Sequence, residues 1–324
     1  MPDPARDRST SRPAVECRGL RKVFRDFWLR PRVVAVDGLD LRIEPGEVFG
    51  LLGPNGSGKS TTIKLLLGLL FPSAGELSLL GGRPGDPGVL ARIGYLPEES
   101  HLYPFLDGAE ILEFTGRLFG VAAPERRRRA EELLDMVGLP DVRGRPVEQY
   151  SKGMQRRIGL AQSLVNDPEL LILDEPTNGL DPIGTRQVKD VIRALRDRGK
   201  TVIVTSHLLS DVEEVCDRVA ILYGGRCRVV GTVDELLDRA ERSLLETDRL
   251  DANAEGAIRR RCAELGIAVH RIDAPRRNLE SLFLEIVRTA RAEGAETSGA
   301  RETGALASFL GGDRAGTSGR GGER

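Results

Sequence analysis

One eight-residue stretch limits what this chain can fold into more than any other feature of its sequence. Residues 53–60 read Gly-Pro-Asn-Gly-Ser-Gly-Lys-Ser and fit the pattern G-x-x-x-x-G-K-[ST]. An apolar run at residues 47–52 predicts a buried strand before this stretch, and a helical pattern begins at Lys59. In such a strand–loop–helix unit, backbone N–H groups and the positive end of the helix face an anion. We therefore predict that this stretch, the phosphate loop, binds the phosphates of a nucleotide.

Individual residues of the phosphate loop have distinct expected roles. Lys59 reaches the β- and γ-phosphates, and the Ser60 hydroxyl is a ligand of Mg²⁺. The loop by itself predicts a P-loop nucleoside triphosphatase without saying which kind. The predicted nucleotide-binding residues here are Gly53, Pro54, Asn55, Gly56, Ser57, Gly58, Lys59, Ser60 and Thr61.

A second apolar run, residues 170–173, ends in two acidic residues, Asp174 and Glu175. Alone, an Asp-Glu pair after a strand is more often a solvated strand end. Beside a phosphate loop, the first carboxylate after such a strand belongs to the Mg²⁺ coordination sphere, and we assign that role to Asp174. Glu175 can then orient and polarise the attacking water, which makes it the candidate general base.

The remaining pattern predicts the fold class. Short apolar runs alternate with helical patterns, which indicates an α/β fold with a parallel sheet covered on both faces. Further strands are predicted at residues 201–205 and 219–222, and helices at residues 130–137, 153–164, 185–198 and 210–216. A small α/β unit at residues 236–292 is expected to have strands at 243–246 and 267–272 and helices at 254–265 and 279–291.

The two ends of the chain differ in composition from the part between them. Residues 1–13 are polar, and residues 293–324 are rich in glycine, serine, threonine and charge. Such segments bury too little apolar surface to offset the entropy lost on ordering. We predict a disordered lead-in and a disordered tail.

Composition also narrows the expected partners and compartment. The net charge is −1 and the pI near 6.4, so the basic footprint of a nucleic-acid-binding protein is missing. The four cysteines are scattered, which predicts reduced thiols in a cytoplasm. No apolar run approaches the ~20 residues needed to cross a bilayer. We expect a cytoplasmic chain that does not bind nucleic acid and does not span a membrane.

Five motifs in order point to a family. Residues 150–155, Tyr-Ser-Lys-Gly-Met-Gln, open a predicted helix with Ser151 as its N-cap. Placed shortly before the Asp-Glu strand, they resemble the signature L-S-G-G-Q of the ABC ATPases. The other matches are Glu98 in a Q-loop, residues 178–181 in a D-loop ending at Asp181, His207 as a switch histidine, and Phe24 as an aromatic residue against adenine. The resemblance covers about residues 19–231.

The resemblance implies an ABC ATPase domain at residues 14–235, with an antiparallel β N-terminal part and a helical subdomain at about residues 98–165. It also implies a head-to-tail dimer, formed with a second copy or with a paired ABC subunit. ATP would lie between the phosphate loop of one protomer and Ser151 and Gly153 of the other, so that only ATP closes the dimer. His207 would contact the γ-phosphate.

Some residues depart from the family pattern. Lys152 replaces the first glycine of the signature and Met154 its glutamine, a form that resembles the ABC-2 type exporter branch, whose ATPases serve separate permeases. Glu98 replaces a glutamine and adds a carboxylate near Mg²⁺. The insertion at residues 25–32 leaves the aromatic residue that stacks on adenine open between Phe24, Phe27 and Trp28.

The resemblance implies a separate multi-spanning permease and a location on the inner face of the cell membrane. The apolar and aromatic residues within 98–119 either dock a permease helix or fill the core of the helical subdomain. Residues 279–286 resemble the helix that closes many exporter ATPases. The competing function is a soluble ABC ATPase acting on ribosomes, nucleic acid or protein assembly. The arginine run at residues 126–129 is flanked by glutamates, which predicts a solvated helix face.

Overall fold

The computed structural model describes residues 12–28, 30–140, 142–237, 247, 250–270, 272 and 304–310. The chain divides into two compact units. Residues 1–236 and 299–324 form the first, and residues 237–298 form the second.

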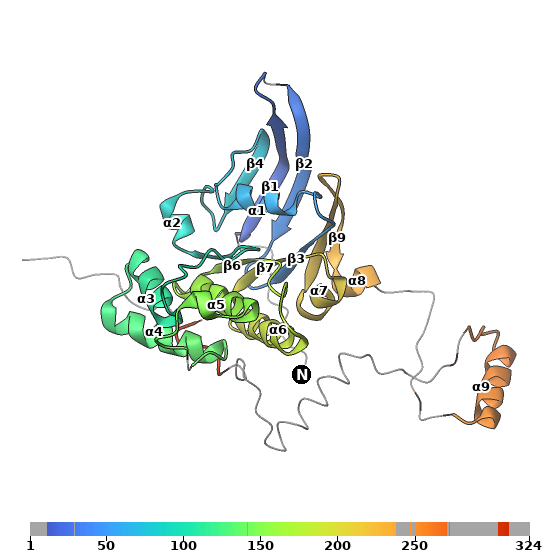
Figure 1. Cartoon of the computed structure of the whole chain (residues 1–324). Coiled ribbons are helices and arrows are strands. Elements are labelled where there is room, and N and C mark those ends of the chain that lie inside the picture. The colour runs from blue at the N-terminus through green and yellow to red at the C-terminus, as the bar shows by residue number, and fades with distance from the viewer. Residues whose placement is uncertain are drawn as a thin grey trace, which may run out of the picture. The chain divides into compact units, whose positions relative to one another are not determined.

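The centre of the first unit is a six-stranded sheet (Figure 1). Five strands are parallel, and β9 pairs antiparallel with β8. Most of the parallel strands are almost wholly apolar because the sheet is covered on both faces, as the alternating pattern predicted. In spatial order the strands are β5 (Ile93–Leu96), β6 (Leu170–Asp174), β7 (Thr201–Ser206), β3 (Val48–Leu52), β8 (Arg218–Tyr223) and β9 (Arg226–Thr232).

An antiparallel sheet and a helix cover one face of this central sheet, as the family resemblance implied. The antiparallel sheet has the order β2 (Pro31–Ile43), β1 (Val15–Arg25), β4 (Ala74–Leu79), and α1 (Lys59–Leu66) and α2 (Pro87–Leu90) lie beside it. Successive residues of β3 point to opposite faces. Phe49 and Leu51 therefore join the apolar cluster on this side, whereas Val48 and Leu52 join the cluster on the other side.

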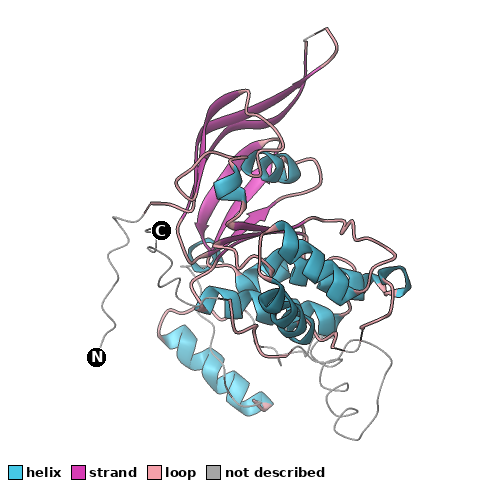
Figure 2. Cartoon of the chain, turned by 90° about the vertical axis from the view of Figure 1, so that its left-hand side faces the viewer, coloured by secondary structure: helices cyan, strands magenta, loops and turns pink. Residues whose placement is uncertain are grey.

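Helices cover the opposite face (Figures 1 and 2). Asp107 caps α3 through a capping box with Glu110, and Ser151 caps α5, as predicted for that residue. These elements are α3 (Gly108–Leu118), α4 (Ala123–Met136), the 3₁₀ turn Val147–Gln149, α5 (Lys152–Leu164), α6 (Pro182–Asp197) and α7 (Leu209–Val215), with the short α8 (Val233–Leu237) after β9. Within the described residues, no helix is both long and apolar enough to cross a membrane.

The predictions for the C-terminal part of the chain are confirmed in one place and wrong in others. Helix α9 (Ala252–Glu264) confirms the helix expected at residues 254–265. The strand expected at 267–272 is not formed by its described residues, and the elements expected at 243–246 and 279–291 lie outside the described part of the chain. The tail was expected to be disordered, but residues 304–310 are packed and include the buried residues Ala307 and Leu310. Composition averaged over 32 residues hid this short apolar stretch.

Candidate nucleotide-binding and catalytic site

The phosphate loop closes around the side chain of Lys59, the first residue of α1. The Lys59 ammonium donates hydrogen bonds to the backbone oxygens of Gly53, at 2.6 Å, and Pro54, at 3.3 Å. Lys59 is buried, so its charge is held inside the curve of the loop. The buried hydroxyl of Ser57 has no partner among the described protein atoms, and a ligand oxygen would satisfy it.

At two positions of the loop, the neighbouring strands leave room for glycine alone. Gly58 has φ 110°, and a Cβ placed there would lie 2.4 Å from the backbone oxygen of Ala35 on β2. Gly53 has φ 151°, and its Cβ would lie 2.3 Å from the backbone oxygen of Leu222 on β8. Any side chain at either position would push the loop away from its neighbouring strand.

Asp174 ends β6 directly opposite Thr205 of β7. The Thr205 hydroxyl donates to Asp174 Oδ1 at 2.5 Å and accepts the backbone N–H of Glu175 at 3.1 Å. One buried hydroxyl therefore orients the candidate metal ligand and fixes the backbone of the candidate base. The sequence reasoning did not identify Thr205, because its role depends on which strand lies beside β6.

Glu175 and His207 meet although 32 residues separate them. The Glu175 Oε2 atom lies 2.8 Å from His207 Nδ1 and accepts the His207 backbone N–H at 3.4 Å. Glu175 is buried and has φ 50°, a left-handed conformation that is strained for a residue with a Cβ. Such strain persists where the surroundings hold the residue in place, and it concentrates at functional sites.

Arg156 of α5 is a buried residue of this site that the sequence reasoning missed. Burial lowers the pKa of its guanidinium to about 10, although neighbouring carboxylates, Asp174 first among them, oppose that shift. The side chain ties the signature helix to the Q-loop position and to the end of β6. Its acceptors are the backbone oxygens of Pro97, Glu98, Asp174, Glu175 and Pro176.

The residues present fit a Mg²⁺ ion bound together with nucleotide. Strands β3, β7 and β6 are adjacent and parallel, so the phosphate loop after β3 and Asp174 at the end of β6 lie at the same edge of the sheet. The described residues contain no cluster of three or more His, Cys, Asp or Glu side chains able to hold a metal alone. Mg²⁺ is ordinarily held by one or two carboxylates and the substrate phosphates, which Asp174 and the Ser60 hydroxyl at the start of α1 can complete.

The signature residues open α5, which packs on the opposite face of the central sheet from α1 and its phosphate loop. Ser151 is exposed, and its hydroxyl accepts the backbone N–H of Met154 at 3.2 Å. Among the described residues, no hydrogen bond joins Ser151 or Gly153 to the phosphate loop. Asp181 caps α6 by accepting the Gly184 N–H at 2.6 Å. An exposed signature is available to a second molecule, which is the arrangement that the family resemblance implies.

Fewer contacts fix the aromatic residues predicted to stack on adenine and the residue at the Q-loop position. Phe24 pairs with Val33 on β2, two residues before the Ala35 that touches Gly58, so it lies on the hairpin that reaches the phosphate loop. Phe27 and Trp28 contact each other edge to face and are strongly exposed. Glu98 is exposed, and its backbone oxygen is held by Arg156.

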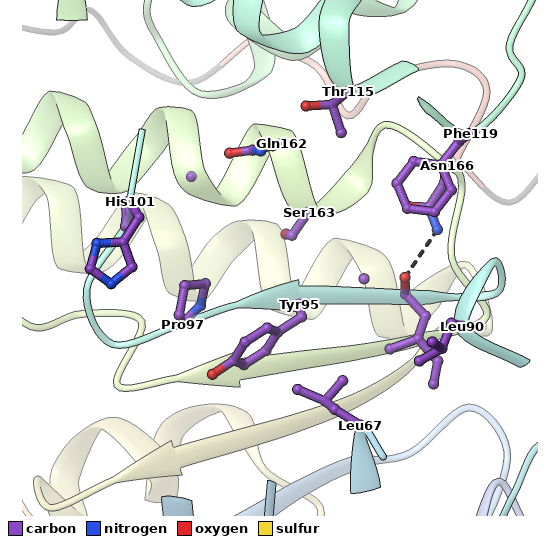
Figure 3. A pocket seen from close by; sticks show the side chains of 14 residues that line it. Leu67, Leu90, Tyr95, Pro97, His101, Thr115, Phe119, Gln162, Ser163 and Asn166 are labelled. Carbon is purple, nitrogen blue, oxygen red and sulfur yellow. Dashed lines mark hydrogen bonds between the residues drawn. The ribbon is translucent and has the colours of Figure 1, made fainter. Parts of the chain in front are cut away.

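A pocket of about 320 Å³ lies between β5, α3 and α5 (Figure 3). Burial raises the pKa of Tyr95, on its floor, to about 12, with Asp174 adding to the shift. Asn166 holds one end of the pocket by donating to the backbone oxygen of Ile93 at 3.0 Å. The wall includes Ser100, His101, Thr115 and Phe119, which belong to the stretch predicted to dock a permease helix or to fill the core.

The apolar residues of that stretch are partly packed in the core and partly exposed. Leu102 and Leu106 pack against the core. Tyr103, Phe105 and Phe114 form an exposed aromatic group, in which the ring centroid of Tyr103 lies 6.0 Å from that of Phe105 and 5.6 Å from that of Phe114.

A family model, relatives of known sequence and a solved structure all point to the same family. A family model described as ABC transporter matches residues 36–178. An uncharacterized ABC transporter ATP-binding protein of Nostoc sp. is 49% identical over 67% of this chain and 66% of its own length, slightly less than two thirds. The daunorubicin/doxorubicin resistance ATP-binding protein DrrA of Streptomyces peucetius is 40% identical over 85% of this chain and 86% of its own. A solved dimeric ATP-binding cassette in a post-hydrolysis state with ADP and Pi is 26% identical, covers 68% of this chain and 98% of its own, and has a TM-score of 0.62.

Proposed function

Since this chain belongs to the family of ABC transporter ATP-binding proteins, we propose that it hydrolyses ATP to drive an export-type transporter whose membrane part is a separate protein. The observation that carries this proposal is the pairing of Glu175 with His207 at the sheet edge that also bears the phosphate loop. This edge combines groups that bind phosphate with a buried carboxylate able to act on water.

Different residues bind the phosphates, hold the metal and activate the water. Lys59 and the loop amides bind the β- and γ-phosphates, and Ser60 and Asp174 hold Mg²⁺, which neutralises charge on the phosphates when bound. Glu175 orients and polarises the attacking water. His207 holds the Glu175 carboxylate, and with ATP bound it would contact the γ-phosphate. Glu98 lies close enough to Arg156 and Tyr95 to shift their pKa values, which supports its place at the rim of the metal site.

Two chains, or this chain and a paired ABC subunit, close head to tail over ATP. The exposed Ser151 and the half-buried Gly153 of one protomer contact the γ-phosphate held by the phosphate loop of the other. Loss of that phosphate removes the contact and opens the dimer, which converts hydrolysis into motion. Phe24 stacks on the adenine, since its strand pairs with the one that touches the loop.

The partner is a multi-spanning permease on the inner face of the cell membrane. The pocket beside β5 and the exposed aromatic group around Tyr103 offer apolar surface to a partner helix. Export is supported by relatives whose names state it, such as the Nod factor export ATP-binding protein I of Cupriavidus metallidurans, 38% identical over 69% of this chain and 73% of its own length.

The test is to trap a tagged Glu175→Gln variant with ATP and Mg²⁺ in its native cells, solubilise gently and identify what copurifies. A multi-spanning membrane protein in stoichiometric amount is the expected result. Recovery of ribosomes, nucleic acid or a soluble assembly, with the chain outside the membrane fraction, would replace the transporter with a soluble ABC ATPase. The matched control is Lys59→Ala, which is not expected to bind ATP and so should not trap the complex.

A further inference from the structure

A short segment near the end of the chain is packed within the first unit. Residues 304–310, which we call the tail segment, read Gly-Ala-Leu-Ala-Ser-Phe-Leu. Ala307, Phe309 and Leu310 are 2%, 9% and 1% exposed. They belong to the same apolar cluster as buried residues of α4, α5 and α6, so the tail segment completes that cluster.

Helix α4 binds the tail segment through polar contacts on one side. The Glu132 carboxylate accepts hydrogen bonds from the backbone N–H of Ser308, at 2.6 Å, and from its hydroxyl, at 3.0 Å. Arg128 donates to the same hydroxyl at 2.8 Å. The N–H of Gly304 donates to the Asp135 backbone oxygen at 2.8 Å. A Cβ on Gly304 would lie 2.9 Å from the backbone oxygen of Asp135 and 2.3 Å from its Oδ2, so a larger residue here would have to shift the segment or the Asp135 side chain.

The arginine run at residues 126–129 is therefore not simply the solvated face that its flanking glutamates predicted. The Arg129 guanidinium lies 4.3 Å from the ring centroid of Phe309, within cation–π range. It also donates to the backbone oxygen of Val165, the C-cap of α5, at 2.7 Å. Arg129 thus joins α4, α5 and the tail segment. The solvated face is confirmed at the exposed Arg127 and Arg128 but not at Arg129, whose partner Phe309 lies about 180 residues away in the sequence.

The other side of the tail segment is held by the catalytic core. Arg198, the C-cap of α6, donates to the backbone oxygens of Ala307 and Leu310, both at 2.7 Å. Helix α6 follows the D-loop position and packs against β7. The tail segment consequently connects α4 with α6. Helix α4 belongs to the helical region of residues 98–165, and α6 belongs to the core, which also bears the catalytic carboxylates.

We propose that the tail segment is an intramolecular strap that holds the helical region in a set position on the catalytic core. This role rests on the proposed function, because in the dimer each chain presents its phosphate loop from the core and Ser151 from the helical region. The relative position of these two surfaces decides whether both ATP sites close together. The strap lowers the ATP concentration needed for closure by limiting the positions of the helical region before ATP binds.

The experiment compares the full chain with a chain ending at residue 303 and with Arg198→Ala, which keeps the full length. Arg127→Ala, at an exposed position in the same arginine run, is the matched control. The first readout is amide hydrogen exchange without nucleotide. The amides of Gly304 and Ser308 should be protected in the full chain, and amides of α4 should exchange at least about tenfold faster in both strap variants. Circular dichroism and thermal melting establish that each variant is folded.

The second readout is the ATP concentration for half-maximal dimerisation in the Glu175→Gln background. It should rise at least about threefold in both strap variants and stay unchanged in the control. Unprotected amides in the tail segment, or unchanged exchange in α4, would show that there is no strap. A loosened α4 with an unchanged ATP requirement would overturn its role in closure. Absence of any ATP-driven dimer in the parent protein would count against the proposed function, while the exchange data would still decide whether the strap exists.

Discussion

The phosphate loop and the pair Asp174–Glu175 lie at the same edge of one sheet but are built in different ways. The loop is a continuous stretch whose shape depends on its own glycines and on Lys59, which bonds back to the loop. The carboxylate pair depends on the neighbouring strand, since Thr205 orients Asp174 and the residue after that strand, His207, contacts Glu175. Phosphate binding is thus encoded locally, whereas the hydrolytic arrangement depends on the strand order.

The substitution that separates hydrolysis from phosphate binding most clearly is Glu175→Gln. Removing the carboxylate should lower ATP hydrolysis by about 10²–10⁴-fold, the usual range for a general base, while ATP binding at the phosphate loop persists. Phosphate release and equilibrium ATP binding measure the two halves separately. Glu169→Gln, at the opposite end of β6, is the control and should retain hydrolysis. Hydrolysis by Glu175→Gln above about a tenth of the parent rate would remove Glu175 from the role of base.

The contribution of the β2 contact to the otherwise local shape of the loop can be tested with two alanine substitutions. Gly56 and Gly58 both have positive φ, but a Cβ at Gly56 meets nothing within 4 Å, whereas one at Gly58 meets β2. Gly56→Ala should lower the free energy of unfolding by about 1–2 kcal/mol from backbone strain alone. Gly58→Ala should lower it by at least about 3 kcal/mol and abolish ATP binding, because β2 must also move. Equal effects in urea unfolding would show that contact with β2 does not shape the loop.

Arg156 connects the carboxylate pair and the Q-loop position to the signature helix, so its substitution should affect turnover more than binding. Arg156→Gln should lower kcat roughly tenfold or more while KM for ATP changes less than about twofold, because Glu175 is misplaced but the phosphate loop is intact. Arg156→Lys should recover part of the rate by restoring a buried donor. Steady-state kinetics of the folded variants provide the measurement. A rise in KM with kcat unchanged would contradict a positioning role for Arg156.

Thr205→Val tests the dependence of the carboxylates on the neighbouring strand. The substitution keeps the shape of the side chain but removes the hydrogen bonds to Asp174 and Glu175. We expect a loss of about 1–3 kcal/mol in stability and a several-fold higher Mg²⁺ requirement for hydrolysis. Chemical denaturation and a Mg²⁺ titration report the two effects. Thr201→Val, at the other end of β7, removes a hydroxyl that binds the Gly46 N–H and should leave the Mg²⁺ requirement unchanged.

The smallest expected effect is that of Glu98→Gln. The side chain is exposed, so loss of its charge should raise the Mg²⁺ concentration for half-maximal hydrolysis only about two- to threefold. Glu99→Gln, the exposed neighbour, is the control. An unchanged Mg²⁺ titration would show that the carboxylate at the Q-loop position has no part in the metal site.

Much of the first unit could be predicted because its signals are local. The buried runs predicted the strands β3, β6, β7 and β8 with boundaries that differ by only a residue or so, and the helix at Lys59 begins where expected. The start of α4 was placed seven residues too late, because Ala123 opens the helix before its apolar pattern becomes visible. The antiparallel sheet came from the family resemblance, since β1 and β2 contain many exposed polar residues and irregular pairing.

What the sequence determined by itself was the phosphate loop, because its glycines, its lysine and the start of α1 are contiguous and bring their own backbone donors. Asp174 and Glu175 could be assigned for the same reason, as they directly follow a buried strand. Only the tertiary structure decided that Thr205 and His207 face these carboxylates, that Arg156 gathers five backbone oxygens, and that the tail segment joins α4 to Arg198. Those contacts join residues far apart in the chain, and neither composition nor periodicity records which buried faces meet.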